Sequence, residues 1–260
     1  MNLLQAIILG AVQGLTEFLP VSSSAHLQFF PWLFGWANPS LSYDAALHLG
    51  TALAVLIFFF KEISALAISQ RKLAFWIIVS NLPAVLIGYF AQDTIEDIFH
   101  KSSYGIPIMA VGLILFGLII YFIDKQANSE IPAEKLNFKQ YLFLGFAQAM
   151  ALIPGVSRSG VTITAGRLLR LSREDATRLS FLLGIPITFG ASLYGVLKVT
   201  TAPVPTEPIH ILLAGTLSSF LVGILAIKWL LGYIKNHPLA IFSWYRLILG
   251  SSILLLWSFR

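Results

Sequence analysis

Two short polar stretches stand out in a sequence that is otherwise mostly apolar. The first lies in residues 13–26 and holds an amide, a carboxylate, four hydroxyls and an imidazole: Gln13, Thr16, Glu17, Ser22, Ser23, Ser24 and His26. The second, residues 154–162, holds one guanidinium, that of Arg158, among hydroxyls and glycines. A hydroxyl beside a base can attack phosphorus, and a guanidinium fork matches phosphate or carboxylate. These residue types therefore indicate chemistry on an anion, and phosphate fits best.

The two stretches align without a gap at a constant offset of 135 residues. Identical residues fall together in several places: Leu9-Gly10 with Leu144-Gly145, Gln13 with Gln148, Val21-Ser22 with Val156-Ser157, and Ser24 with Ser159. The pairs differ where charge matters: Glu17 with Leu152, Ser23 with Arg158, and His26 with Val161. This pattern indicates an old duplication whose copies have specialised, so that one supplies the acid and imidazole and the other supplies the arginine.

In the first stretch, Glu17 follows Gln13 by one helical turn, so both face one side. A carboxylate at membrane depth is costly and usually marks a functional path, although Glu17 can also serve as the structural partner of Arg158. His26 can act as an acid or base, or be a satisfied core residue. Ser23 is the candidate nucleophile. The alternative is that one of Ser22, Ser23 and Ser24 caps the next helix.

In the second stretch, a helix beginning near Ser159 would aim its free N–H groups at an anion beside Arg158. Gly155 and Gly160 allow close approach of the backbone to a ligand. We therefore predict phosphate binding by Arg158, with a buried ion pair to Glu17 as the alternative. The substrate-binding residues predicted around the two centres are Gln13, Ser22, Ser157, Ser159, Gly160 and Thr162.

Four further polar residues, in three places, lie outside these stretches. Asp44 and His48 are one helical turn apart. They can line the outer opening of the same site or bind a metal together with Glu17. The alternative is that Asp44 is an interfacial acid favoured by the dipole at the start of its helix. Asn81 precedes Pro83 at a helix break and can hydrogen-bond a hairpin. Arg246 follows Trp244 and Tyr245, which favours an interface anchor.

Composition indicates an all-α polytopic membrane protein. The chain has 260 residues, is 57% hydrophobic and only 11% charged, and its mean hydropathy is +0.81. Residues 3–19 are apolar but end in Glu17 and Pro20, and residues 25–37 are too short to cross a bilayer, so together they predict a re-entrant hairpin with its tip at residues 20–24. Spans are expected at 44–60, 73–91 and 105–123. After a charged linker at 124–139, a second hairpin (140–153 and 160–171) precedes spans at 179–197, 209–232 and 239–258.

Each half, 1–123 and 140–260, thus has one hairpin and three crossings, so the halves are expected to be inverted repeats. With the N-terminus outside, the inner segments hold twelve basic residues: Lys61, Arg71, Lys72, Lys125, Lys135, Lys139, Arg167, Arg170, Arg173, Arg178, Lys228 and Lys235. The outer segments hold three: Lys101, Lys198 and Arg260. This asymmetry predicts the orientation.

Other classes of function lack support in the sequence. The start of the chain has no basic region of the kind that precedes a cleavable signal, and cysteine is absent. Nucleotide-binding glycine motifs and zinc-type ligand spacings are absent, and the net charge of +5 maps to loops rather than to a nucleic-acid surface. A hard cation held by Glu17 and phosphate oxygens remains compatible with the sequence.

The chain resembles the undecaprenyl-diphosphate phosphatase family, also called the bacitracin-resistance family. Two motifs carry the resemblance: Glu-Phe-Leu-Pro-Val-Ser-Ser-Ser-Ala-His at 17–26 and Pro-Gly-Val-Ser-Arg-Ser-Gly at 154–160. The similarity covers essentially the whole chain. It implies a bacterial plasma-membrane enzyme that removes the terminal phosphate of undecaprenyl diphosphate on the periplasmic side. It thereby recycles the lipid carrier for peptidoglycan synthesis and gives bacitracin resistance. It also implies a divalent cation, Mg²⁺ or Ca²⁺.

Matched by position, the resemblance places the family's acidic motif on Gln13 and Glu17, its serines on Ser22 and Ser23, and its histidine on His26. The arginine motif falls on Ser157, Arg158 and Thr162. Many members have Glu at the position of Gln13, so here the acid or metal-binding role rests on Glu17 alone. The catalytic set is therefore Glu17, Ser23, His26 and Arg158. The partners are a polyprenyl diphosphate and the bilayer, and a homodimer is left open.

A transporter or lipid flippase is the rival class, because inverted repeats with broken helices are common in transporters. Its site would bind the same headgroup without cleaving it. A nucleophile and a base beside an anion clamp favour the enzyme, since binding alone requires neither.

Overall fold

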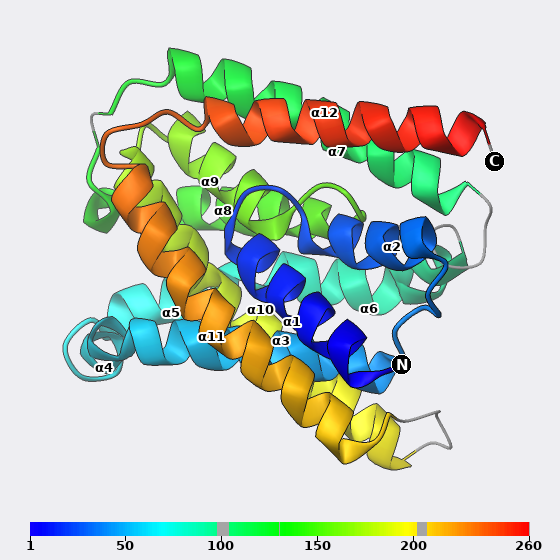
Figure 1. Ribbon diagram of the computed structural model, residues 1–260. Coiled ribbons are helices and arrows are strands. Elements are labelled where there is room, and N and C mark those ends of the chain that lie inside the picture. The colour runs from blue at the N-terminus through cyan, green and yellow to red at the C-terminus, as the bar shows by residue number, and fades with distance from the viewer. Residues whose placement is uncertain (98–103, 130, 202–206, 260) are drawn as a thin grey trace.

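The computed structural model describes residues 1–97, 104–129, 131–201 and 207–259, and in these ranges the chain is helical with no strand (Figure 1). Between the described α-helices lie 3₁₀ turns at Ala133–Lys135 and Met150–Leu152. The α-helices, in chain order, are α1 Leu3–Phe18, α2 Ser23–Phe34, α3 Leu41–Phe58, α4 Phe60–Ile68, α5 Arg71–Ser80, α6 Leu82–Glu96, α7 Gly105–Gln126, α8 Phe138–Ala149, α9 Arg158–Leu168, α10 Arg173–Thr201, α11 Ile209–Tyr233 and α12 Ala240–Ser258.

Both predicted hairpins are present, as α1–α2 and α8–α9, and local sequence explains their ends. Asn2 and Asn137, which are 135 residues apart, each begin a hairpin with a capping box completed by Gln5 and Gln140. Such a box satisfies free N–H groups at a helix start. α1 ends two residues before Pro20, because the residue before a proline is disfavoured in helical conformation. The hairpins open toward opposite ends of the molecule (Figure 1).

Within the described ranges, six helical stretches are long and apolar enough to cross a membrane, as predicted. They are Leu41–Phe58, Arg71–Ala91, Gly105–Gln126, Arg173–Gly195, Ile209–Tyr233 and Ala240–Ser258. The break predicted in the second of them falls at Asn81, between α5 and α6. The chain is therefore a multi-pass membrane protein in which the hairpin helices, of 16 residues or fewer, are shorter than any of these spans.

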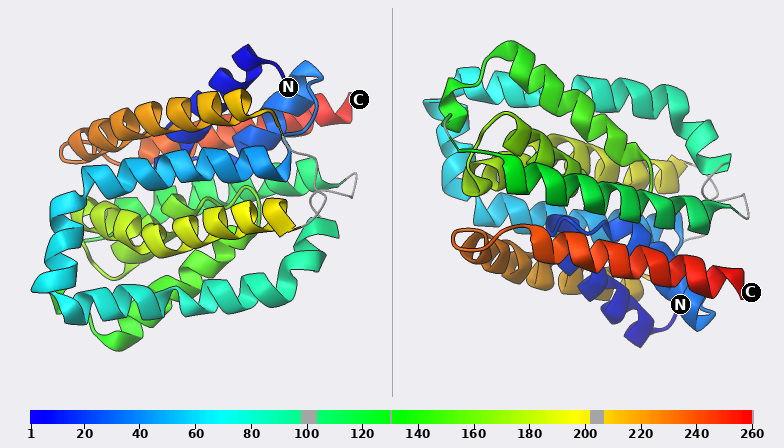
Figure 2. Two further views of the ribbon diagram at one scale, coloured as in Figure 1. Left: turned by 90° about the horizontal axis from the view of Figure 1, so that it is seen from below. Right: turned by 90° about the horizontal axis from the view of Figure 1, so that it is seen from above.

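Helices of one half pack mainly on helices of the other (Figure 2). α1 lies against α11, whereas α8 lies against α5 and α6. Two close approaches match at the offset of 135: a Cβ on Gly10 would lie 2.6 Å from the Gly215 carbonyl, and one on Gly145 would collide with the Ser80 carbonyl. Asn81 also accepts a hydrogen bond from Gln148 of the second hairpin (2.7 Å). These matched contacts agree with an inverted repeat, which itself stays a prediction.

Asp124 differs from its expected place in a solvated linker. Its side chain is 3% exposed, and its Oδ1 accepts from Arg167 Nε (3.1 Å) and Arg173 Nε (2.8 Å). Its Oδ2 accepts from the backbone N–H of Leu239 at 2.9 Å. A buried charge requires paired and hydrogen-bonded neighbours, and this one has them. The carboxylate therefore ties α7 to α9, α10 and the approach to α12 at the basic end of the molecule.

We predict that Gly145→Ala lowers the free energy of unfolding by about 2 kcal/mol, because the new methyl group collides with the Ser80 backbone in a packed helix contact. Thermal unfolding in detergent measures the effect. Gly232→Ala is the matched control, since no atom lies within 4 Å of a Cβ there. Equal melting temperatures for the two variants would contradict the prediction.

Candidate active site

The site lies where the tips of the two hairpins meet, and both tips bend in the same unusual way. Ser22 and Ser157, the residues that precede α2 and α9, have φ of 75° and 74°. Such angles cost of order 1–3 kcal/mol for a residue other than glycine and cluster at functional sites. In each tip the bent serine lies within hydrogen-bonding distance of the serine two residues on, Ser22 with Ser24 (3.1 Å) and Ser157 with Ser159 (3.2 Å).

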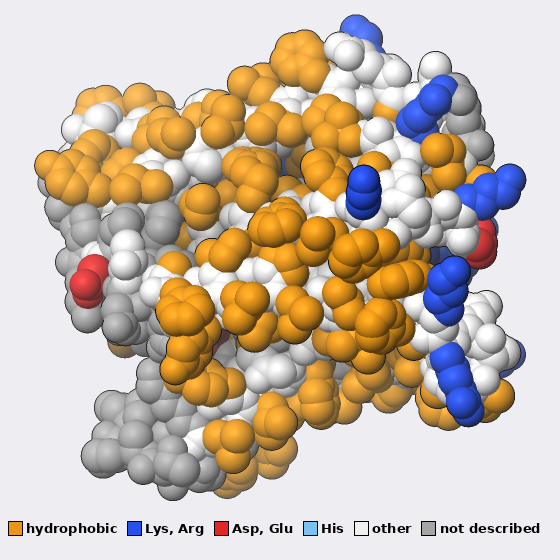
Figure 3. Space-filling view, turned by 180° about the vertical axis from the view of Figure 1, so that it is seen from behind, with side chains coloured by type: hydrophobic (Ala, Val, Ile, Leu, Met, Phe, Trp, Pro, Cys, Tyr) orange, Lys and Arg blue, Asp and Glu red, His pale blue; other side chains and the backbone are white. Residues whose placement is uncertain are grey.

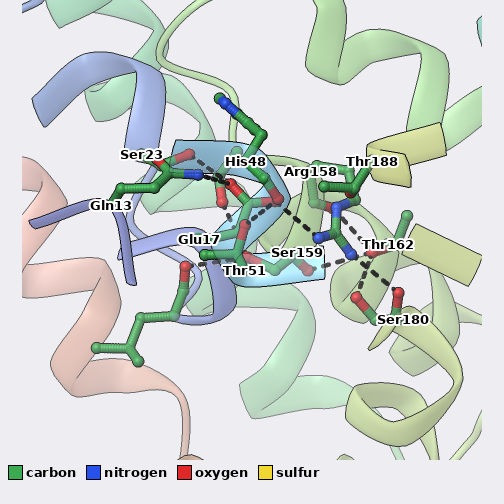
Figure 4. Close-up of polar contacts among 12 residues, drawn as sticks. Gln13, Glu17, Ser23, His48, Thr51, Arg158, Ser159, Thr162, Ser180 and Thr188 are labelled. Atoms are coloured by element: carbon green, nitrogen blue, oxygen red, sulfur yellow. Dashed lines mark hydrogen bonds and ion pairs between the residues drawn. The ribbon is translucent and has the colours of Figure 1, made fainter. Parts of the chain in front are cut away.

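Glu17 is the centre of the site (Figure 4). It lies at the end of α1 and is 8% exposed. Its Oε1 accepts from Arg158 Nη2 at 2.8 Å, and its Oε2 accepts from Ser23 Oγ at 2.8 Å and from Gln13 Nε2 at 3.2 Å. One carboxylate thus contacts three of the residues that the sequence placed in the site, although they come from two tips.

Arg158 is held from both sides. Its Nη2 pairs with Glu17, and its Nη1 donates to the Ser180 carbonyl on α10 at 3.1 Å. Gly184 leaves the room for this, because a Cβ there would overlap the guanidinium. The side chain keeps 14% exposure, and these bonds use only two of its five N–H groups. It can therefore bind an anion while it stays fixed in place.

The neighbouring hydroxyls mostly shape the second tip. Ser157 Oγ caps α9 by accepting from Gly160 N (3.1 Å), and Ser159 Oγ donates to the Leu19 carbonyl of the first tip (2.9 Å). Thr162 Oγ1 lies 2.7 Å from the Arg158 carbonyl and 2.6 Å from Ser180 Oγ. Ser159 therefore links the two tips. Ser157 and Thr162 stabilise the first turns of α9, the helix that begins at Arg158.

His26 lies in the first tip but away from Ser23. Its Nδ1 is 2.7 Å from the Ser22 carbonyl, and its Nε2 is 2.7 Å from the Tyr245 hydroxyl on α12. A carbonyl only accepts, so Nδ1 carries the hydrogen, and a neutral ring accepts from Tyr245. Both ring nitrogens are thus engaged, and within the described residues the hydrogen-bond partner of Ser23 is Glu17, not His26.

Arg246 differs from the expected interface anchor: it is fully buried beneath both tips. Its guanidinium donates to five carbonyl oxygens: Pro20 (3.2 Å) of the first tip, Gly155 (2.7 Å) and Val156 (3.1 Å) of the second, and Gly112 (3.4 Å) and Leu113 (3.2 Å) of α7. Among the described residues it has no carboxylate partner. The sequence did contain a sign that Arg246 is buried. It lies about two turns inside a predicted span, which is too deep for an interface anchor.

The donor set can help to hold a cation but cannot form a complete cage. No group of three or more His, Cys, Asp or Glu side chains of metal-binding geometry occurs in the described part of the chain. However, Gln13 is fully buried, and its Oε1 has no hydrogen-bond partner there. This amide oxygen and Glu17 offer hard oxygen ligands that phosphate oxygens could complete, as is usual for Mg²⁺.

These features define a class: a polytopic membrane protein with a half-enclosed acid, hydroxyl and arginine suited to phosphate chemistry. The sequence matches the family described as bacitracin resistance protein BacA over residues 6–252, and the chain belongs to that family. A protein of Caldicellulosiruptor bescii named undecaprenyl-diphosphatase is 43% identical, over 100% of this chain and 99% of its own length. Proteins of the same name from Pelotomaculum thermopropionicum and Geobacter metallireducens are each 40% identical over 98% of this chain, and over 97% and 98% of their own lengths.

We predict that Arg246→Gln lowers the melting temperature and also abolishes turnover, because several buried carbonyls lose their donors and the tips separate. Arg246→Lys should restore only part of both properties, since an ammonium is one point of charge and cannot span five carbonyls. Thermal unfolding and phosphate release are the measurements. Lys228→Gln, a basic residue on α11, is the control; wild-type activity in Arg246→Gln would contradict the prediction.

Proposed function

We propose that this protein hydrolyses a polyprenyl diphosphate, undecaprenyl diphosphate above all, to the lipid monophosphate and inorganic phosphate. The observation that carries the proposal is the contact of Glu17 with both Ser23 and Arg158 across the two tips. The relatives bear the name of this activity. A multi-pass helical protein also gives the prenyl chain an apolar surface, so the headgroup can reach the tips while the tail stays in lipid.

In the proposed reaction, Arg158 and the first N–H groups of α9 bind the diphosphate and stabilise the charge that develops on the transferred phosphoryl group. Ser23 Oγ attacks the terminal phosphorus and gives its proton to Glu17, its hydrogen-bond partner. The bond to the bridging oxygen breaks, and the lipid monophosphate leaves. Water then hydrolyses the phosphoserine. In the alternative, Ser23 orients a water that attacks directly.

In our proposal His26 is a positioning residue, whereas the sequence led us to expect a catalytic base. Its two contacts, to the Ser22 carbonyl and the Tyr245 hydroxyl, tie the first tip to α12. In the proposal it fixes the backbone that presents Ser23 and does not accept the Ser23 proton. Acid quenching during turnover separates the two forms of the reaction: a trapped phosphoserine at Ser23 supports covalent catalysis, and retained activity in Ser23→Ala supports direct attack by water.

A divalent cation, Mg²⁺ or Ca²⁺, is part of the proposal. Glu17 and the free amide oxygen of Gln13 would hold it together with phosphate oxygens of the substrate. When bound, such an ion neutralises phosphate charge and polarises the phosphoryl group. Because the protein offers few ligands, we expect the cation to bind together with the diphosphate and weakly without it.

We predict that Glu17→Ala and Arg158→Ala each reduce release of inorganic phosphate from farnesyl diphosphate by at least about 100-fold, because each removes a contact to the reacting groups. Purified protein in detergent is assayed, and melting temperatures confirm folding. Glu62→Ala is the matched control, because it also removes a glutamate–arginine ion pair, in this case the surface pair of Glu62 with Arg178. Turnover near wild type in either site variant refutes the mechanism; a wild type that binds but never hydrolyses the substrate indicates the flippase.

The proposed location is the bacterial inner membrane, with the site open to the periplasm. Lys and Arg gather at one end of an apolar surface (Figure 3), the end expected to face the cytoplasm. The two hairpins place their tips deep between the helices, and the first hairpin opens toward the opposite end.

We predict that a membrane-impermeant maleimide labels Asn38→Cys, between α2 and α3, in intact spheroplasts. It should label Gln70→Cys, between α4 and α5, only after lysis, because that loop lies among the basic residues. The natural chain contains no cysteine and is the unlabelled control. The reverse pattern would contradict the proposed orientation.

A further inference from the structure

A second histidine lies beside the site, and one of its nitrogens has no hydrogen-bond partner in the part of the chain that the structure describes. His48 is on α3, which packs against α1 and α10. Its Nδ1 is 2.9 Å from the Asp44 carbonyl and 3.8 Å from Asp44 Oδ1. Because neither group donates, Nδ1 must carry a hydrogen. Its Nε2 has no hydrogen-bond partner among the described residues, whereas both nitrogens of His26 are engaged.

The position of His48 relates it to the reacting groups. In Figure 4 the side chain of His48 lies near Glu17 of α1 and Arg158 of α9. The side chain is 28% exposed, so a ligand can reach it. Thr51, one turn further on, donates to the His48 carbonyl (3.0 Å) and steadies this part of α3. The imidazole is therefore close to the acid and the arginine without being bonded to either.

We propose that His48 is a substrate-binding residue whose Nε2 donates a hydrogen bond to a phosphate oxygen of the diphosphate. The ring donates from both nitrogens in its protonated form, to Asp44 at Nδ1 and to the anion at Nε2. The Asp44 carboxylate, 3.8 Å from Nδ1, stabilises that form. The proposal rests on the proposed function and adds a donor from α3 to those of the two tips, so that three elements surround the headgroup.

The proposed contact explains the arrangement better than a purely structural role. A purely structural role would be fulfilled by the contact of Nδ1 with the Asp44 carbonyl, and it would leave the position of the imidazole near the Glu17–Arg158 pair unexplained (Figure 4). An anion bound to Arg158 would also meet the carboxylate of Glu17, and a further donor offsets that repulsion. Hydrogen bonds between charged groups are about twice as strong as neutral ones, so the effect on binding should be measurable.

The test compares His48→Leu and His48→Gln with wild type. His48→Leu should raise KM for farnesyl diphosphate, and the Kd for inorganic pyrophosphate, by about tenfold, which is the loss expected for one charge-assisted hydrogen bond. His48→Gln should stay within about threefold of wild type, because its amide reaches a similar point and still donates. His237→Leu is the matched control. The Nδ1 of His237 makes the same contact with a carbonyl four residues earlier (3.0 Å), but His237 is exposed and follows the C-terminal end of α11, Tyr233.

Unchanged KM and pyrophosphate Kd in His48→Leu would overturn the proposal, and so would an equal loss in His48→Gln. If His48→Leu does not fold, ¹⁵N-histidine NMR of the wild type decides: addition of pyrophosphate must shift the His48 Nε2 resonance and leave that of His237 in place. Failure of the proposed function is a separate result, because a wild type without turnover can still show whether pyrophosphate binding depends on His48.

Discussion

The geometry of the site depends on one buried cation that has no carboxylate partner among the described residues. Arg246 donates to carbonyl oxygens of the first tip, the second tip and α7, and so fixes the distance between two hairpins that are more than a hundred residues apart in sequence. Taking a guanidinium out of water is costly, and carbonyl dipoles that α7 and the tips already present offset part of that cost. The tips are bent, and their carbonyls are outside regular helical hydrogen bonding, which makes them available as acceptors. The pair of Glu17 and Arg158 lies on a platform that this single side chain holds together.

The two tips are alike in backbone and unlike in chemistry. Ser22 and Ser157 share a φ near 75°, and each lies close to the serine two residues on. Charge was then divided, because the first tip carries the acid and the hydroxyl and the second carries the arginine. Placing opposite charges on different elements means that neither tip is complete alone, and that their ion pair (2.8 Å) forms only when the halves are packed. Formation of the site is thus coupled to assembly of the membrane domain.

Much of this could be predicted from the sequence, and the failures have physical reasons. Apolar runs and prolines located the six spans and both hairpins, since length and backbone chemistry decide those. The approach of Glu17 to Arg158 followed from the repeat. The surroundings of His26, Asp124 and Arg246 did not follow, because their partners are mostly backbone carbonyls or residues more than 40 positions away. A hydroxyl next to an imidazole in sequence indicates a base, yet the first turn of α2 directs His26 toward Tyr245 and leaves Ser23 with Glu17.

The manner in which Arg246 holds the tips has an evolutionary consequence. Every amino acid supplies a carbonyl oxygen, so the side chains at Pro20 and Val156 can change without loss of these hydrogen bonds so long as the backbone path is kept. Gly155 is different, because its φ is +91° and a Cβ there would collide with the Met109 backbone. Lineages can therefore vary those side chains of the tips that neither react nor need a special backbone angle, without loss of the support beneath. The arginine itself would be nearly immovable, because no other side chain can donate to all of these carbonyls at once.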